Sequence, residues 1–320
     1  MQVQATFFLI VAAILISSAR LSAAEPESTP KTLPKQLSAE EATALPPALR
    51  ALLPLHQSKG MPQAGTWLDR HEERGGNYRQ YVESNPIRAT NDRRTIYIQP
   101  LGKFSEKQQQ ILALSAEFLE AYYQLPVKTN EPLGQEILPM HAKRNGPRGE
   151  QLLSIYLLEQ VLQPRLPGDA AVMIGFTATD LWPGEGWNFV FGQAALNDRV
   201  GVWSMNRFGD PSESDEAFQQ TLHSTLRTAV HETGHMFTVP HCIYFECAMN
   251  GSNHLQEADS QPLWLCPQCQ AKLNYATGAE PKKQFQALIS FAEKHGLEKE
   301  RAFWQQSLKL TEDLNKPQRE

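Results

Sequence analysis

Hydrophobic and polar positions predict alternating strands and helices from about residue 95 onward. Short apolar runs rich in β-branched and aromatic residues predict strands, and apolar residues spaced by three or four predict helices. The predicted strands are Thr95–Pro100, Leu125–Lys128, Ala170–Thr177, Asn188–Ala194 and Val200–Met205. The predicted helices are Ser105–Tyr123, Gly149–Leu162, one that begins at Ser212, and two amphipathic helices within 282–313. This alternation indicates an α/β fold with C-terminal helices.

The helix predicted to begin at Ser212 is the most informative element. Ser212 and Asp215 fit a capping box, and the acidic first turn suits the helix dipole. The apolar stripe of this helix consists of Phe218, Leu222, Leu226, Ala229 and Val230. Because the stripe continues to residue 230, the polar residues that follow it, beginning with His231, belong to the same helix.

The N-terminal region shows no such alternation. Phe7–Ile16 is an unbroken apolar run that is shorter than the roughly 20 residues a membrane-spanning helix needs. Small residues end at Ala24, which suits a signal-peptidase site, although the residues before the run include no Lys or Arg. We therefore predict a cleaved signal peptide at 1–24 and a secreted or periplasmic protein, with an uncleaved anchor as the alternative. Residues 25–63 are proline-rich and predict a tether or a surface wrap, which leaves a domain at 64–320.

Composition narrows the function classes. The 320 residues are 41% hydrophobic and 20% charged, which is typical of a globular protein. A formal net charge of -5 offers no basic surface for nucleic acid or for an anionic membrane. The four cysteines all lie between Cys242 and Cys269, which indicates one local site instead of a scattered disulfide framework. We expect a monomer.

Residues 231–241 read HETGHMFTVPH and predict a metal centre. His231 and His235 are four residues apart, so both imidazoles project from one helix face and can bind one ion. Pro240 ends the helical geometry, which allows His241 to return as a third ligand. Three histidine nitrogens with an open fourth position are typical of catalytic zinc. The alternative is a buried helix whose histidines bind backbone or acidic groups.

Glu232 lies on the flank of the same helix. A carboxylate there can accept a proton from a water that zinc activates, and can later deliver it to the leaving amine. These residue types therefore predict zinc-dependent amide hydrolysis of a peptide or protein substrate, with Glu232 as general base.

The four cysteines form two pairs, Cys242 with Cys247 and Cys266 with Cys269. The C-x4-C and C-x2-C spacings suit a tetrahedral structural zinc. Two disulfides are the alternative, which a secreted protein permits.

Together these motifs resemble the archaemetzincin family, whose signature continues the metzincin HExxHxxGxxH motif into C-x4-C-x-M and a later C-x2-C. The resemblance covers about residues 64–275 and implies a metzincin-like zincin with a twisted mixed sheet over the active-site helix. It implies two zinc ions, one held by the three histidines and one by the four cysteines. It also implies that Met249 is the Met-turn residue beneath the histidines, and that 188–194 is an edge strand above the cleft, where extended peptides pair by backbone.

One position departs from the family pattern. Thr238 stands where the family has glycine, and a β-branched residue in a left-handed turn costs roughly 1–2 kcal/mol. We expect Thr238 to have a negative φ, because Pro240 already imposes a change of direction. The function predicted is a secreted zinc metallopeptidase. A catalytically silent zinc-binding module that binds peptides is the alternative that Thr238 favours, whereas Glu232 favours the enzyme.

Overall fold

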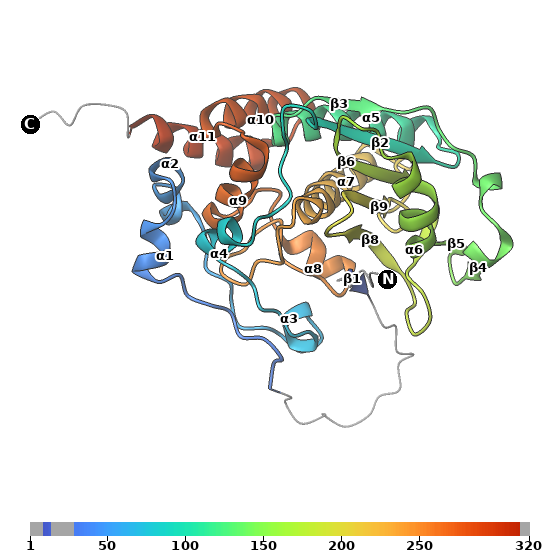
Figure 1. The fold of residues 1–320 in the computed structure, drawn as a ribbon, viewed down its shortest axis with the longest axis horizontal. Coiled ribbons are helices and arrows are strands. Elements are labelled where there is room, and N and C mark those ends of the chain that lie inside the picture. The colour runs from blue at the N-terminus through green and yellow to red at the C-terminus, as the bar shows by residue number, and fades with distance from the viewer. Residues whose placement is uncertain (1–8, 14–28, 314–320) are drawn as a thin grey trace, which may run out of the picture.

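A twisted mixed sheet forms the centre of the computed structural model, which describes residues 9–13 and 29–313 (Figure 1). Eight strands follow the order β3-β2-β6-β9-β8-β7-β5-β4, and β1 pairs with β8 outside this path. The strands are β1 (Leu9–Ala13), β2 (Thr95–Leu101), β3 (Val127–Thr129), β4 (Lys143–Gly146), β5 (Gly149–Leu153), β6 (Ala170–Thr177), β7 (Asp180–Trp182), β8 (Val190–Ala195) and β9 (Val200–Ser204). The pairs β2–β3, β2–β6, β6–β9 and β5–β7 are parallel, and the remaining pairs are antiparallel.

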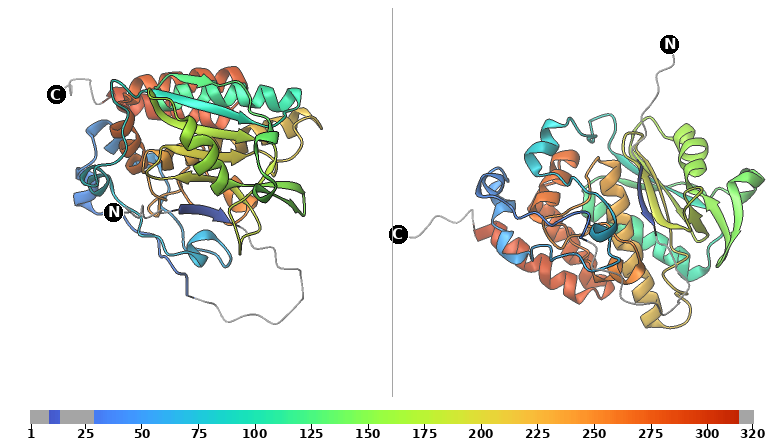
Figure 2. Two further views of the ribbon diagram at one scale, coloured as in Figure 1. Left: turned by 45° about the vertical axis from the view of Figure 1, so that its right-hand side comes forward. Right: turned by 90° about the horizontal axis from the view of Figure 1, so that it is seen from below.

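Helices cover both faces of this sheet (Figure 2). The larger core lies between one face and a helical layer that includes α5, α7 and α10. The smaller core covers the other face, where residues 157–162 form a π-helix. The α-helices are α1 (Ala39–Thr43), α2 (Pro47–Arg50), α3 (Trp67–Arg70), α4 (Tyr78–Glu83), α5 (Glu106–Tyr123), α6 (Ser154–Tyr156), α7 (Asp215–Met236), α8 (Leu255–Ser260), α9 (Pro267–Thr277), α10 (Pro281–His295) and α11 (Glu298–Asp313). The predicted α/β class with C-terminal helices is confirmed.

Most predicted elements are confirmed, and two are wrong in part. Residues 149–153 form strand β5 instead of the first turns of a helix, because Gly146 and Gly149 close a hairpin with β4 and Gly149 has a φ of 104°. The active-site helix begins at Asp215, not at Ser212. Its N-cap is Ser214, whose hydroxyl accepts a hydrogen bond from the Ala217 N–H.

The proline-rich segment packs along the domain as a wrap from residue 29 onward. Leu45, Leu49 and Leu52 are buried in the larger core, and α2 contacts α9 and α11. The N–H of Lys59 donates to the carbonyl of Tyr244, which joins the wrap to the loop that follows α7.

The predicted signal segment 1–24 lies outside the described residues except for β1. That strand pairs antiparallel with β8. Within the described part of the chain, no helix combines the length and the apolar character needed to cross a membrane.

Candidate active site

Helix α7 and the turn after it bring three histidines together. His231 and His235 lie on adjacent turns of α7, and the chain returns so that His241 faces them. One ring nitrogen of each histidine lies within 4.8 Å of the others, and all three side chains are buried. The structure thus brings together the three histidines that the sequence predicts as metal ligands.

The second ring nitrogen of each histidine has an oxygen partner. The Nδ1 of His231 lies 2.8 Å from the carbonyl oxygen of Ala248, and the Nδ1 of His235 lies 2.7 Å from that of Val239. The Nδ1 of His241 lies 2.6 Å from Oε1 of Glu73. Oxygen acceptors at these positions place the ring proton on Nδ1, which leaves each Nε2 as a bare lone pair.

These lone pairs face one another without a proton between them. The two Nε2 atoms of His231 and His235 are 3.0 Å apart, and the Nε2 of His241 has no hydrogen-bond partner. Burial and the neighbouring imidazoles lower the pKa of His235 to about 3 and that of His231 well below its usual value, so both rings are neutral. Converging lone pairs are stabilised by a cation, and neutral imidazoles suit Zn²⁺.

Glu73 is a site residue that sequence reasoning missed. It lies between α3 and α4, and the indole N–H of Trp67 donates to the same Oε1 at 2.7 Å. The backbone N–H of Glu73 donates to the hydroxyl of Thr32 in the wrap. Although burial opposes ionisation, His241 and the hydrogen bond from the Trp67 indole hold the pKa of Glu73 below its ordinary value. No local spacing could reveal this carboxylate, because only the tertiary fold brings it to His241.

The turn after α7 corrects the expectation for Thr238. Its φ is 64°, in the left-handed region. The Thr238 N–H donates to the carbonyl of His235 at 2.8 Å, and the Val239 N–H donates to that of Gly234 at 3.0 Å. This pair of bonds is a Schellman motif, so the helix ends in a left-handed cap with threonine in the usual glycine position. The Thr238 hydroxyl accepts a hydrogen bond from the Ile87 N–H at 2.9 Å, which offsets part of the strain.

Glu232 lies against strand β8. A Cβ at Gly192 would stand 2.6 Å from Oε1 of Glu232, so the absence of a side chain at this position makes room for the carboxylate. Burial raises the pKa of Glu232 to about 8, and the nearby Arg227 opposes that shift. Glu232 is therefore a desolvated carboxyl group next to His231. A charge placed nearby would shift its pKa strongly, because little water screens the interaction.

Met249 lies beneath the histidine-bearing helix. Its Sδ occupies the space that a Cβ at Gly234 would need, at 2.6 Å, and the side chain is buried. Gly234 precedes His235 directly, so Met249 packs against the part of α7 that holds the second histidine. This placement suits the floor that the resemblance implies.

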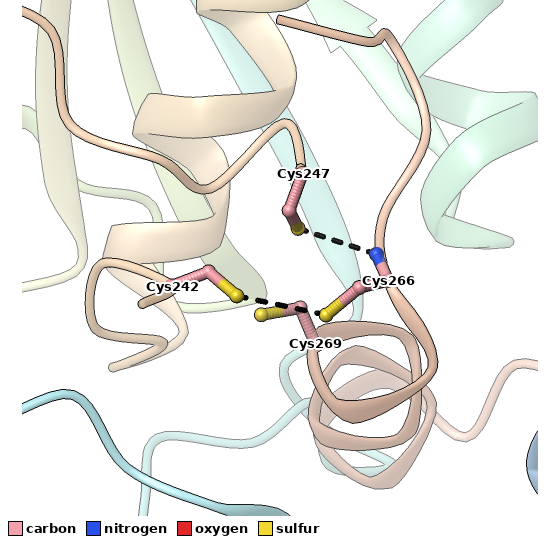
Figure 3. Close-up of side chains that lie close together, drawn as sticks. All are labelled: Cys242, Cys247, Cys266 and Cys269. Atoms are coloured by element: carbon pink, nitrogen blue, oxygen red, sulfur yellow. Dashed lines mark hydrogen bonds between the residues drawn. The ribbon is translucent and has the colours of Figure 1, made fainter. Parts of the chain in front are cut away.

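The four cysteines converge at a second centre (Figure 3). Their sulfurs lie within 4.8 Å of one another, and none forms a disulfide. The Sγ atoms of Cys242 and Cys266 are 3.6 Å apart, close to the roughly 3.8 Å expected for two thiolates about 2.3 Å from one tetrahedral zinc. The disulfide alternative is therefore wrong in this structure.

The surroundings of the cysteines suit thiolates that bind a cation. The backbone N–H of Cys266 donates to the Sγ of Cys247 at 3.2 Å. Cys266 is also the N-cap of α9, and Cys269 lies in its first turn, where the helix dipole favours negative charge. Burial raises the pKa of Cys247 and Cys266, a cost that a bound zinc removes.

Comparison with known proteins gives the family. A sequence model of peptidase family M54 matches residues 170–275, which span β6 to α9. Archaemetzincin-2 of Macaca fascicularis is 34% identical over 260 residues, which cover 70% of this chain and 71% of the relative. The chain belongs to the archaemetzincin family. It is a zinc metallopeptidase, as the resemblance implied.

Other archaemetzincins align over shorter parts of this chain. Archaemetzincin of Thermococcus kodakarensis is 30% identical over 188 residues, which cover 56% of this chain and 95% of the relative. The crystal structure of archaemetzincin from Methanopyrus kandleri matches with a TM-score of 0.49 at 27% identity, over 59% of this chain and 98% of that chain.

Proposed function

We propose that this archaemetzincin hydrolyses peptide bonds at a zinc ion held by His231, His235 and His241, with Glu232 as general base. The observation that carries the proposal is the set of three imidazoles whose Nδ1 atoms all have oxygen partners while their Nε2 atoms converge. A zinc ion bound there supplies a Lewis acid that polarises the scissile carbonyl and acidifies the attacking water.

Glu232 performs the proton transfers. A pKa raised by burial lies near neutral pH, which suits a group that must both accept and release a proton. A cation among the histidines favours the ionised form, so the carboxylate can accept the proton of the attacking water. The same oxygen then donates that proton to the leaving amine.

Strand β8 supports the binding of an extended peptide. Its edge pairs antiparallel with β1 over residues 190–195, so it has the geometry to accept an added strand. Gly192 places Glu232 directly against this strand. A substrate paired with β8 would therefore run past the general base. We further propose that the protein is secreted and that cleavage after Ala24 removes β1 and frees this edge for substrate.

We also propose a structural zinc at the four cysteines, giving two ions per monomeric chain. The silent zinc-binding module is less well supported, because Thr238 adopts the left-handed cap and His241 still faces the other two histidines.

The decisive experiment compares Glu232→Gln with Glu216→Gln, an exposed carboxylate in the first turn of the same helix. Glu232→Gln should lower hydrolysis of a casein-derived peptide mixture by at least about a hundredfold, since general-base catalysis contributes roughly 10²–10⁴. Both variants should keep two zinc ions by elemental analysis, and His241→Ala should keep one. Full activity in Glu232→Gln, or an unchanged zinc content in His241→Ala, would overturn the mechanism.

The localisation is tested with the full-length chain expressed in a secretion-competent host. A mature protein outside the cytoplasm with Glu25 as its first residue supports a cleaved signal peptide. Retention of residues 1–24 on a membrane-bound product would instead support the anchor.

A further inference from the structure

Arg227 is a buried cation that forms no ion pair with any carboxylate of the described residues. It lies on α7 one turn before His231, and its side chain is 4% exposed. Its Nε has no hydrogen-bond partner, and no ion pair of Arg227 occurs within the described part of the chain. A buried charge is costly unless it is paired.

Arg207, whose side chain is 9% exposed, shows how a nearly buried arginine is usually neutralised. Arg207 donates to both carboxylate oxygens of Asp180, at 2.8 and 2.6 Å. The acidic residues whose charges influence Arg227 are Asp259 and Glu232, and neither lies within ion-pair distance of it. Burial lowers the pKa of Arg227 to about 10, so its guanidinium remains charged at neutral pH.

The side chain of Arg227 faces a small cavity that adjoins the catalytic residues. The cavity has a volume of about 20 Å³, and its walls include Phe191 of β8, His231 and Glu232. About 10–15 Å³ of this kind of volume holds one water, so the cavity fits a short group such as a carboxylate but no long side chain.

The protonation of the leaving amine indicates which substrate residue would lie nearest this cavity. Glu232 must come within hydrogen-bond distance of the leaving nitrogen to protonate it. The residue that carries this nitrogen therefore lies on the Glu232 side of the scissile bond. Because Glu232 is part of the cavity wall, the side chain or terminus of that residue would lie next to the cavity that Arg227 faces.

We propose that Arg227 binds a carboxylate on the substrate residue that follows the scissile bond. The carboxylate is either an aspartate side chain or the C-terminal carboxylate of the peptide. An ionised oxygen would pair with the guanidinium, which has no carboxylate partner among the described residues, by charge-assisted hydrogen bonds, which are the stronger class. This inference rests on the proposed function and specifies its substrate class.

Binding is measured with two peptide-like inhibitors that each carry a hydroxamate as the zinc-binding group. They differ only in the side chain next to the hydroxamate, which is –CH2COO⁻ in one and –CH2CONH2 in the other. Calorimetry with the zinc-loaded protein should show the carboxylate compound binding at least tenfold more tightly. Arg227→Met should reduce this ratio to nearly one, Arg227→Lys should keep part of it, and the exposed control Arg148→Met should keep all of it. Equal binding of the two compounds by the unsubstituted protein would overturn the role of Arg227. Failure of both compounds to bind would instead remove the proposed zinc site, and this inference with it.

Cleavage of matched peptides distinguishes the two sources of the carboxylate. One pair has Asp or Asn after the scissile bond, and the other has a final Gly with a free or an amidated terminus. Faster cleavage of the Asp peptide than of the Asn peptide supports recognition of the side-chain carboxylate. Faster cleavage of the free-acid peptide than of the amidated one supports recognition of the C-terminal carboxylate. If Arg227→Met abolishes this preference but cleaves the neutral peptides as fast as the unsubstituted protein does, Arg227 recognises the substrate carboxylate. An equal fall in kcat for all four peptides would show that Arg227 acts only through Glu232, and would overturn the proposal.

Discussion

Oε1 of Glu73 lies 2.6 Å from Nδ1 of His241, although 168 residues separate the two in sequence. A carboxylate that accepts the Nδ1 proton orients the imidazole and raises its basicity toward a metal. The third proposed zinc ligand thus depends on a residue held in place by the wrap, through Thr32.

Glu73→Gln should weaken zinc binding at the histidine centre by about 10–100-fold, because the charged acceptor is lost while the shape is kept. The measurement is competition for zinc against a chelator, with the four-cysteine ion as an internal reference. Glu72→Gln, which changes an exposed neighbour, is the matched control and should bind zinc normally. If the two variants bind zinc equally well, Glu73 has no positioning role.

Gly192→Ala should impair catalysis without removing zinc. The new Cβ would lie 2.6 Å from Oε1 of Glu232 and 2.7 Å from its Cδ, so the carboxylate must move. Displacement of a catalytic group by about 1 Å can cost on the order of a hundredfold in rate. Peptide hydrolysis and zinc content are measured together, with Gly168→Ala as the control because no atom lies within 4 Å of its added Cβ. Normal hydrolysis by Gly192→Ala would show that Glu232 tolerates the shift.

Sequence predicted those parts of the site that local geometry determines. His231 and His235 share a helix face, and Pro240 predicts the end of the helix, so the eleven residues 231–241 contain all three predicted ligands. The turn that returns His241 is nevertheless made by the left-handed cap at Thr238. Glu73 and Gly192 could not be predicted, because their roles arise from contacts between distant segments. The helix predicted over 149–162 is wrong at its start, because the turn between Gly146 and Gly149 makes residues 149–153 the second strand of a hairpin.

His56 should make the stability of the protein depend on pH. Its ring lies 5.3 Å from that of Phe303 and 6.2 Å from that of Phe245, and burial lowers its pKa from 6.5 to about 4. Above pH 6.5 the ring is neutral in both the folded and the unfolded chain. Between pH 6.5 and 4 the unfolded chain binds the proton first, so stability falls by up to about 1.4 kcal/mol per pH unit, or about 3 kcal/mol in total.

The check is the change in Tm between pH 7 and pH 5 for the unsubstituted protein, His56→Phe and His141→Phe. His56→Phe should lose part of the decrease in Tm, and His141→Phe, a substitution at an exposed position, is the control. Protonation of the zinc-binding histidines affects all three proteins alike, so the comparison isolates His56. Identical pH dependence in all three would mean that His56 titrates normally.

Thr238 combines a strained backbone with a compensating hydrogen bond. Its φ of 64° costs about 1–2 kcal/mol for a β-branched residue, and the hydroxyl bond to the Ile87 N–H returns about 1 kcal/mol. Thr238→Gly relieves the strain but loses the bond, so its free energy of unfolding should stay within about 1 kcal/mol of the unsubstituted protein. Thr238→Val keeps the shape and the strain without the acceptor, and should be destabilised by about 1–2 kcal/mol. Urea denaturation of the zinc-loaded proteins measures both. A valine variant as stable as the unsubstituted protein would show that the hydroxyl contributes nothing to the cap that brings His241 to the other two histidines.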